Sequence, residues 1–131
     1  MGSGKCEYKN KSIAESFRNA FNGILEAVKS ERNLVIHLVC AIIVVAAGII
    51  LDIDLLRWIC LTMVIGIVFV SELVNTAIEK LTDMVTPEYC EQARRVKDIG
   101  AAAVLISALV AVTAGILIFW QPVIDFLERR F

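Results

Sequence analysis

The amino-acid sequence predicts an all-α integral membrane protein, in which an N-terminal amphipathic surface helix precedes three transmembrane helices. Three observations predict this fold class. Hydrophobic residues make up 58% of the 131-residue chain, its mean hydropathy is +0.74, and the apolar residues gather in three long segments. Soluble domains of this length are less apolar. We expect one domain over residues 1–131, with residues 1–4 as a remnant of expression outside the fold.

The first helix is expected at residues 12–29. Apolar residues recur there at helical spacing, and polar residues occupy the rest of the helical wheel. Ser12 and Glu15 form an S-x-x-E capping box, which favours a helix start at this point. Such a helix can lie on the membrane surface or pack on the spans of its own chain, and the sequence is compatible with both.

The three transmembrane helices are expected at residues 34–51, 58–81 and 99–120. Each is long enough to cross about 30 Å of hydrocarbon at about 1.5 Å per residue, the first only just. A stripe of small side chains recurs at every fourth position of the third span, namely Ala103, Ser107, Ala111 and Gly115. Because such stripes let helices approach closely in lipid, and three spans enclose a polar site poorly, we expect a homo-oligomer.

Basic residues predict the orientation of the chain. The connector after the first span holds one, Arg57, whereas many more precede the first span or follow the second: Lys5, Lys9, Lys11, Arg18, Lys29, Arg32, Arg94, Arg95 and Lys97. The positive-inside rule therefore predicts a cytoplasmic N-terminus and an outside C-terminus, although Arg129 and Arg130 oppose this weakly. In this topology the start of the first span, the end of the second and the start of the third meet at the cytoplasmic face.

Polar side chains line one face of the second span: Glu72, Asn75, Glu79 and Asp83. They share that face because a helix turns by about 100° per residue. Glu72 follows Trp58 by 14 residues, and so lies about 21 Å along a span of about 30 Å. A carboxylate at this depth is costly unless it is paired, protonated or hydrated, and is therefore a functional candidate. The stripe could instead only join helices by hydrogen bonds, but three carboxylates exceed what that role needs.

These residue types suit particular chemistry. A deep Glu suits a general base, and the shallower Glu79 suits a hard divalent cation with oxygen ligands. His37 is expected to be a hydrogen-bonded interfacial residue, because no second His exists to share a metal ion. Four distant cysteines support neither a zinc site nor a disulfide framework: Cys6, Cys40, Cys60 and Cys90. The net charge of −1, without a basic block, argues against nucleic-acid binding.

The stretch ELVNTAIEKLTD, residues 72–83, resembles the signature of the small prokaryotic diacylglycerol kinase family, roughly E-x-x-N-[ST]-[SA]-x-E-x-x-x-D. The stretch KDIGAAAVL resembles the start of that family's third transmembrane helix. ERNLVIH, before the first span, resembles the Gram-positive branch, whose members are closer to undecaprenol kinases. The resemblance runs from the amphipathic helix to Trp120, with one small departure at Thr82, where a hydrophobic residue is expected.

The resemblance implies a homotrimeric lipid kinase of the bacterial cytoplasmic membrane, with Mg²⁺ as cofactor, that moves the γ-phosphate of ATP to a lipid hydroxyl. Undecaprenol is the lipid that the branch implies, and diacylglycerol is the alternative. The implied site comprises the base Glu72, the metal ligands Glu31 and Glu79, and the substrate- and nucleotide-binding residues Asn75, Lys97, Asp98 and Asp83. Phosphoryl transfer needs mainly positioning and charge stabilisation, which acidic metal ligands and a Lys supply.

Two other functions compete with this one. In a small proton-coupled transporter subunit, Glu72 would be the proton site of an oligomeric bundle. The acids, however, crowd the cytoplasmic side, and the outer half of all three spans is almost uncharged. A purely structural membrane protein would leave the carboxylates unexplained.

Overall fold

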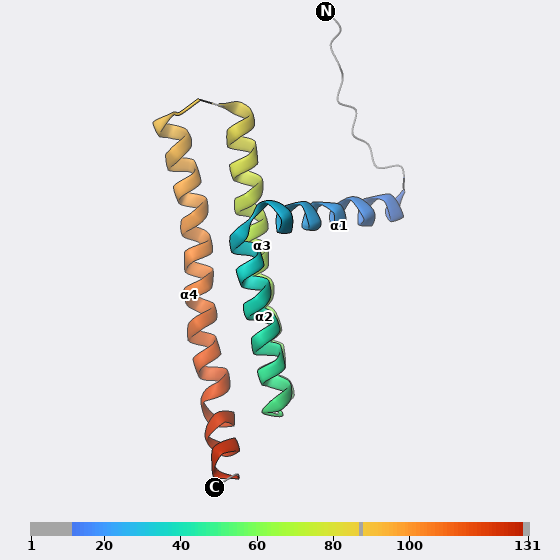
Figure 1. Ribbon diagram of the computed structural model, residues 1–131, viewed down its shortest axis with the longest axis vertical. Coiled ribbons are helices and arrows are strands. Elements are labelled where there is room, and N and C mark those ends of the chain that lie inside the picture. Colours follow the sequence, from blue (N-terminus) through green and yellow to red (C-terminus); the bar gives the residue numbers. More distant parts are fainter. Residues whose placement is uncertain (1–11, 87, 130–131) are drawn as a thin grey trace, which may run out of the picture.

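The computed structural model describes residues 12–86 and 88–129. Residues 1–4 and Cys6, on which two of the predictions fall, lie outside this part. The described residues form four helices: α1 (Ile13–Ser30), α2 (Arg32–Ile50), α3 (Leu55–Val85) and α4 (Glu91–Glu128). In Figure 1, α2, α3 and α4 run alongside one another in alternating directions, and α1 extends crosswise away from them. The molecule is therefore all-helical.

Helix α1 begins where the capping pattern predicts. The hydroxyl oxygen of Ser12 accepts a hydrogen bond of 3.1 Å from the backbone N–H of Glu15. Of the α1 side chains only Ala27 is buried, whereas Ile13 is 80% and Phe17 74% exposed. The apolar face of α1 is thus left uncovered by the described residues of the chain.

Three helices are long and apolar enough to cross a membrane, namely α2, α3 and α4. Helix α3 packs along α4 over much of its length, and α2 contacts α3 less extensively. A small apolar core of Ile53, Leu61 and Ile118 joins them at one end. Most of the remaining apolar surface faces outward, for example Ile42 at 62% and Leu117 at 74% exposed. So much exposed apolar surface suits a multi-pass membrane protein rather than one surrounded by water.

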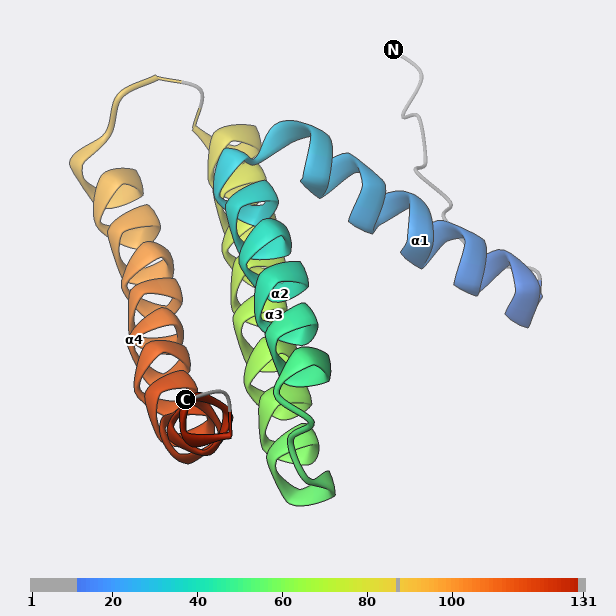
Figure 2. The same cartoon turned by 60° about the horizontal axis from the view of Figure 1, so that its bottom comes forward.

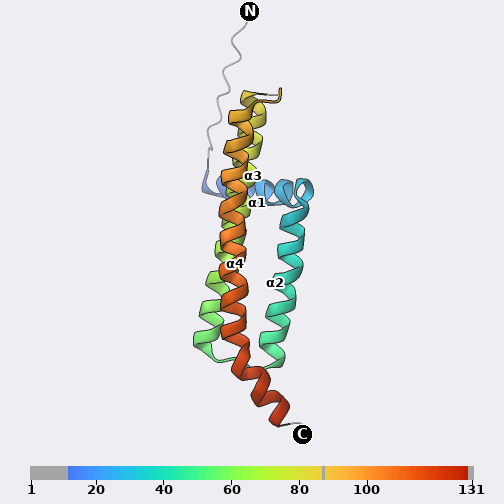
Figure 3. The same cartoon turned by 90° about the vertical axis from the view of Figure 1, so that its left-hand side faces the viewer.

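Helices α3 and α4 extend beyond the apolar segments at 58–81 and 99–120. Polar residues continue both helices outside the apolar stretch, so hydropathy alone underestimates their length. At its far end α4 contains the buried Pro122, where the helix bends instead of ending, as Figure 3 shows. Proline removes one backbone N–H donor and crowds the preceding turn, which accounts for a bend at this point.

The connector between α2 and α3 is a tight turn. Asp52 has a positive φ of 50°, a conformation that Asp tolerates better than most residues. Asp54 caps α3: its carboxylate accepts a hydrogen bond of 3.0 Å from the backbone N–H of Arg57 and forms an ion pair with the Arg57 guanidinium. The backbone hydrogen bond, together with that charge, lowers the pKa of the Asp54 carboxyl. These contacts hold the start of α3 in place.

Candidate active site

The candidate site lies where α1 crosses α3. The ammonium Nζ of Lys80 on α3 lies 2.6 Å from Oε1 of Glu26 on α1. Residues of both helices, Gly23 and Ala27 on one side and Thr76 on the other, line a shallow hollow at the crossing. Figures 1 and 3 show the last turns of α3 and the first turns of α4 continuing past α1, which leads away from the other helices in Figure 2 as well. The predicted polar stripe of α3 therefore starts near the level of α1 and continues beyond it.

Glu72 is the most deeply buried acid of this region, with 2% of its surface exposed. Its Oε1 lies 3.1 Å from Nε2 of His37 on α2. The contact has the distance of an ion pair but lacks hydrogen-bond geometry, so Oε1 has no hydrogen-bond donor among the described residues. The hydroxyl of Thr76 donates to the backbone carbonyl of Glu72 at 2.9 Å. A buried carboxylate oxygen with an incomplete set of partners remains open to a substrate proton or cation.

Asn75 holds the carboxylate of Glu79 on the next turn of α3. Its amide Nδ2 donates a hydrogen bond of 2.8 Å to Oε1 of Glu79, while its own Oδ1 is buried without a hydrogen-bond partner among the described residues. Gly100 of α4 lies directly against this amide, and a Cβ atom at that position would overlap Asn75 Oδ1. The close approach of the two helices thus depends on the absence of a side chain at Gly100.

Glu31 brings a further carboxylate to the same place. It is the residue between α1 and α2, its backbone is extended, and its side chain makes no capping hydrogen bond. The charges of Glu31 and Glu79 both act on Glu72. Among the described residues, however, no three His, Cys, Asp or Glu side chains are arranged to hold a metal ion by themselves. A cation here would need ligands from a bound molecule as well.

The remaining predicted site residues form a second group, farther along the helices. Lys97 Nζ lies 2.6 Å from Oδ1 of Asp83, joining the start of α4 to the end of α3. Asp98 pairs instead with Arg94 on its own helix, at 2.6 Å. Asp83 follows Glu79 by one helical turn, or about 6 Å. The two groups therefore lie about one helical turn apart along α3.

The sequence reasoning did not find the contact between His37 and Glu72. The two residues stand on different helices and are 35 positions apart, so no helical periodicity connects them. The available signal was topological, because α2 begins directly after the α1 crossing and His37 lies less than two turns into it. The structure adds His37 to the candidate site on the basis of this contact.

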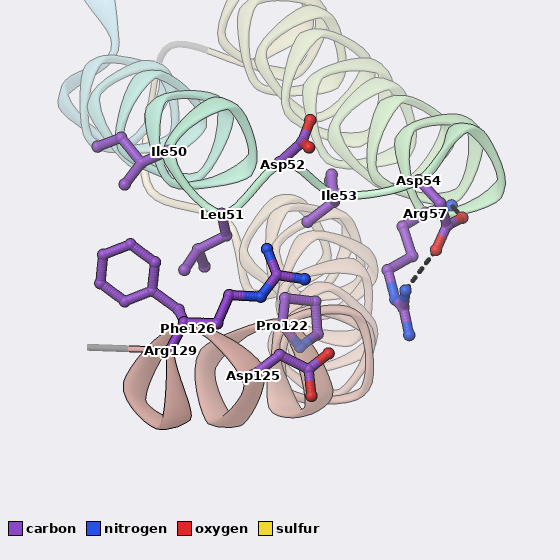
Figure 4. Close-up of a pocket in the computed structure, with 10 residues that line it drawn as sticks. All are labelled: Ile50, Leu51, Asp52, Ile53, Asp54, Arg57, Pro122, Asp125, Phe126 and Arg129. Atoms are coloured by element: carbon purple, nitrogen blue, oxygen red, sulfur yellow. Dashed lines mark hydrogen bonds and ion pairs between the residues drawn. The ribbon is translucent and has the colours of Figure 1, made fainter. Parts of the chain in front are cut away.

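Two cavities flank the bundle. One, of about 380 Å³, is an apolar crevice between α2, α3 and α4, and His37 is among its lining residues with Cys40, Val68 and Ala111. The other, of about 390 Å³, lies at the opposite end of the spans, between the α2–α3 connector and the end of α4. Figure 4 shows Arg57 paired with Asp54 there, and Arg129 reaching over the cavity. The charged side chains of this second cavity are not buried. The apolar crevice is the cavity connected to the candidate site, because His37 lines it.

Comparisons of the sequence with known proteins identify related lipid kinases. The sequence model of prokaryotic diacylglycerol kinase matches residues 18–119. An undecaprenol kinase of Bacillus subtilis is 35% identical over 105 residues, which cover 80% of this chain and 85% of that protein. A diacylglycerol kinase of Synechocystis is 33% identical over 115 residues, covering 87% of this chain and 66% of that protein. A diacylglycerol kinase of Escherichia coli is 38% identical over 71 residues, covering 54% of this chain and 58% of that protein.

Proposed function

Because this chain belongs to the prokaryotic diacylglycerol kinase family, we propose that it phosphorylates the hydroxyl group of a membrane lipid with ATP. The observation that carries the proposal is the buried Glu72 carboxylate, which is 2% exposed and has one oxygen without a hydrogen-bond donor among the described residues. A general base needs such an oxygen, accessible to one proton and shielded from water.

The proposed reaction transfers the phosphoryl group and one proton in a single balanced step. The lipid hydroxyl oxygen forms a bond to the γ-phosphorus of ATP, while the bond from that phosphorus to the β–γ bridging oxygen breaks and ADP leaves with the electron pair. Glu72 takes the hydroxyl proton. Asn75, which holds Glu79 and lies beside Gly100, positions the reacting groups. Phosphoryl transfer depends chiefly on such positioning and on charge stabilisation.

Glu31 and Glu79 would hold Mg²⁺ in this proposal. The chemistry of the donor set supports the fit, because the donor atoms of both carboxylates are oxygens, which Mg²⁺ prefers. The described residues do not form a complete cation site. That fits Mg²⁺ in particular, which proteins commonly hold through one or two carboxylates together with substrate phosphates. When bound, the ion would neutralise charge on the phosphates during transfer.

The phosphates themselves would lie toward the second group of residues. Lys97 would neutralise phosphate charge in place of its present partner Asp83, with Asp98 beside it. Lys is a common phosphate ligand because its ammonium group acts as a compact positive charge. Since Lys97 and Asp83 stand near the ends of α4 and α3 that continue past α1, the nucleotide would approach from outside the lipid.

Undecaprenol is the lipid that we propose. The support is the undecaprenol kinase of Bacillus subtilis, which matches 80% of this chain and is itself covered over 85% of its length. Diacylglycerol is the alternative, since diacylglycerol kinases also match. Both lipids present a primary hydroxyl, so the same acid residues would serve either one.

We further propose how the chain lies in the membrane. The end of the bundle at the α1 crossing faces the cytoplasm, because most basic residues of the described chain lie there: Lys29, Arg32, Lys80, Arg94, Arg95 and Lys97. The uncovered apolar face of α1, with Phe17 74% and Phe21 60% exposed, would rest on the cytoplasmic membrane surface. The C-terminus would then lie outside.

A homotrimer completes the proposal. The three spans of one chain leave most of their apolar side chains exposed, and no atom lies within 4 Å of a Cβ placed on Gly115 of the small-residue stripe. Neighbouring copies would cover part of this surface by close helix packing.

The test is a side-by-side assay in mixed micelles with labelled ATP and Mg²⁺, offering undecaprenol in one reaction and diacylglycerol in the other. Glu72→Gln serves as the inactive variant, and Glu128→Gln, which alters an exposed carboxylate at the opposite end of α4, is the matched control. We expect labelled undecaprenyl phosphate from the wild type and from Glu128→Gln. If only diacylglycerol gives a labelled product, diacylglycerol and not undecaprenol is the substrate. If neither lipid gives a product that depends on Glu72, the kinase proposal is refuted and the transporter function is favoured.

A further inference from the structure

We propose that His37 is a positioning residue for Glu72: its ring holds the buried carboxylate ionised and oriented, ready to take the proton of the lipid hydroxyl. This inference rests on the proposed function and deepens it, because it concerns the same site. It adds a residue from α2 to a reaction whose other participants lie on α3, on α4 and at the α1–α2 junction.

The geometry of the pair is specific. His37 Nε2 lies 3.1 Å from Glu72 Oε1, and the two side chains are 22% and 3% exposed. Among the described residues, His37 is the one basic side chain in contact with this carboxylate. A carboxylate so well buried loses most of its hydration, and an adjacent cation is the usual means of keeping it charged.

The acidic residues around Glu72 explain why a basic partner matters there. Glu31, from the α1–α2 junction, and Glu79, from α3 itself, both bring negative charge toward it. From α4, Gly100, which has no side chain, lies against Asn75, one turn from Glu72. The nearby cation Lys80 is already paired with Glu26 of α1. His37 is therefore placed to offset two neighbouring negative charges.

Histidine gives this partnership a dependence on pH that another cation would lack. It is the side chain that ordinarily changes charge between about pH 5 and 8. A protonated ring favours the carboxylate form of its partner through its charge. In more alkaline solution, where protons are scarcer, any carboxylate depends less on such a charge. The contribution of His37 should thus be greatest on the acid side of the activity profile.

The experiment compares the pH dependence of lipid phosphorylation by wild type, His37→Gln and the control Cys40→Ala, which alters another lining residue of the same crevice. At about pH 6 we expect His37→Gln to lower kcat by about tenfold or more, with the lipid KM little changed. At about pH 8.5 the deficit should shrink to about twofold or less. Cys40→Ala should follow the wild type throughout.

Two further variants separate a positioning role from a structural one. Added imidazole should restore activity to His37→Ala, since a small ring can enter the crevice of about 380 Å³. In the Glu72→Gln background, His37→Gln should cause no additional loss. A His37→Gln deficit equal at all pH values, or His37→Ala that imidazole leaves unimproved, would overturn the inference while the wild-type kinase activity stands. A wild type that phosphorylates neither lipid would overturn both proposals.

Discussion

At the scale of single residues, the site is marked by buried oxygens with too few partners. Glu72 Oε1 and Asn75 Oδ1 are both buried and lack hydrogen-bond donors among the described residues. An unsatisfied buried polar atom costs about 1–3 kcal/mol. A stripe that only joined helices would bond its polar atoms to polar atoms of another helix. The hydrogen bond from Asn75 to Glu79 stays within α3, and Glu72 Oε1 meets the ring of His37 at 3.1 Å without hydrogen-bond geometry. Joining helices therefore does not account for these polar side chains.

Two substitutions separate the base from the metal ligand. Glu72→Gln keeps the size of the side chain but removes its ability to take a proton, so turnover should fall by about 10²–10⁴-fold with nucleotide affinity nearly unchanged. Glu79→Gln should weaken binding of magnesium nucleotide as well, because a cation ligand is lost. Titration of each variant with a fluorescent ATP analogue, with and without Mg²⁺, measures the difference. Equal nucleotide affinity in both variants would contradict the separate roles.

Gly100 provides a test of packing at the site. A Cβ at this position would overlap Asn75 Oδ1, so Gly100→Ala should force the helices apart or push Asn75 off Glu79. Overpacking costs about 1–3 kcal/mol, partly offset by the better helix propensity of Ala. Gly66→Ala is the matched control, because no atom lies within 4 Å of a Cβ there. Thermal unfolding in detergent should show loss of stability, and the kinase assay loss of rate, for Gly100→Ala only.

At the scale of helices, hydropathy and capping patterns predicted most of what the structure shows. The capping box placed the start of α1 because Ser12 and Glu15 interact locally. Apolar length located the three long helices, but not their ends, since polar residues extend α3 to Val85 and Pro122 bends α4 without terminating it. Contacts between helices, such as His37 with Glu72, depend on how the helices are rotated and crossed, which sequence periodicity does not encode.

The ion pair between Glu26 of α1 and Lys80 of α3 should weaken as the pH falls. Lys80 lowers the pKa of the Glu26 carboxyl, first through a hydrogen bond and then through its charge. A lowered pKa in the folded chain means that the link is fully formed above the ordinary range of Glu and is lost as the pH falls through the lowered value. It should therefore be intact at neutral pH, although its exposure makes it a weak contact.

Hydrogen exchange of the α1 backbone amides measures this link. At neutral pH Glu26→Gln should exchange faster along α1 than the wild type, because α1 loses its ion pair with α3. Arg18→Gln is the control, since Arg18 pairs with Glu15 within α1 and not with another helix. Equal exchange in Glu26→Gln and the wild type would show that packing alone holds α1 in place.

At the scale of the whole molecule, the orientation in the membrane can be tested through Cys90. This residue precedes α4, and the backbone N–H groups of Ala93 and Gln92 lower the pKa of its thiol. The thiolate, which is the reactive form, therefore persists to lower pH than for an ordinary cysteine. In a Cys6→Ser background, a membrane-impermeant maleimide should label Cys90 in inside-out vesicles and not in intact cells.

A residue at the opposite end of α4 supplies the control for this labelling experiment. Arg129→Cys, made in a background without Cys6 and Cys90, places a thiol at the far end of α4, beside the cavity of Figure 4. It should react in intact cells and be protected in inside-out vesicles. The reverse labelling pattern at the two positions would invert the proposed topology and place the candidate site outside the cell.

The burial of Glu72 within a helix long and apolar enough to cross a membrane also bears on how the rate of the proposed reaction would be controlled. The lipid hydroxyl would meet the base while its hydrocarbon tail stays in the bilayer. Enzyme and lipid would then encounter each other by diffusion in two dimensions. Turnover should depend on the mole fraction of the lipid in the membrane and not on its amount per volume of suspension, so inert phospholipid would slow the reaction by dilution alone.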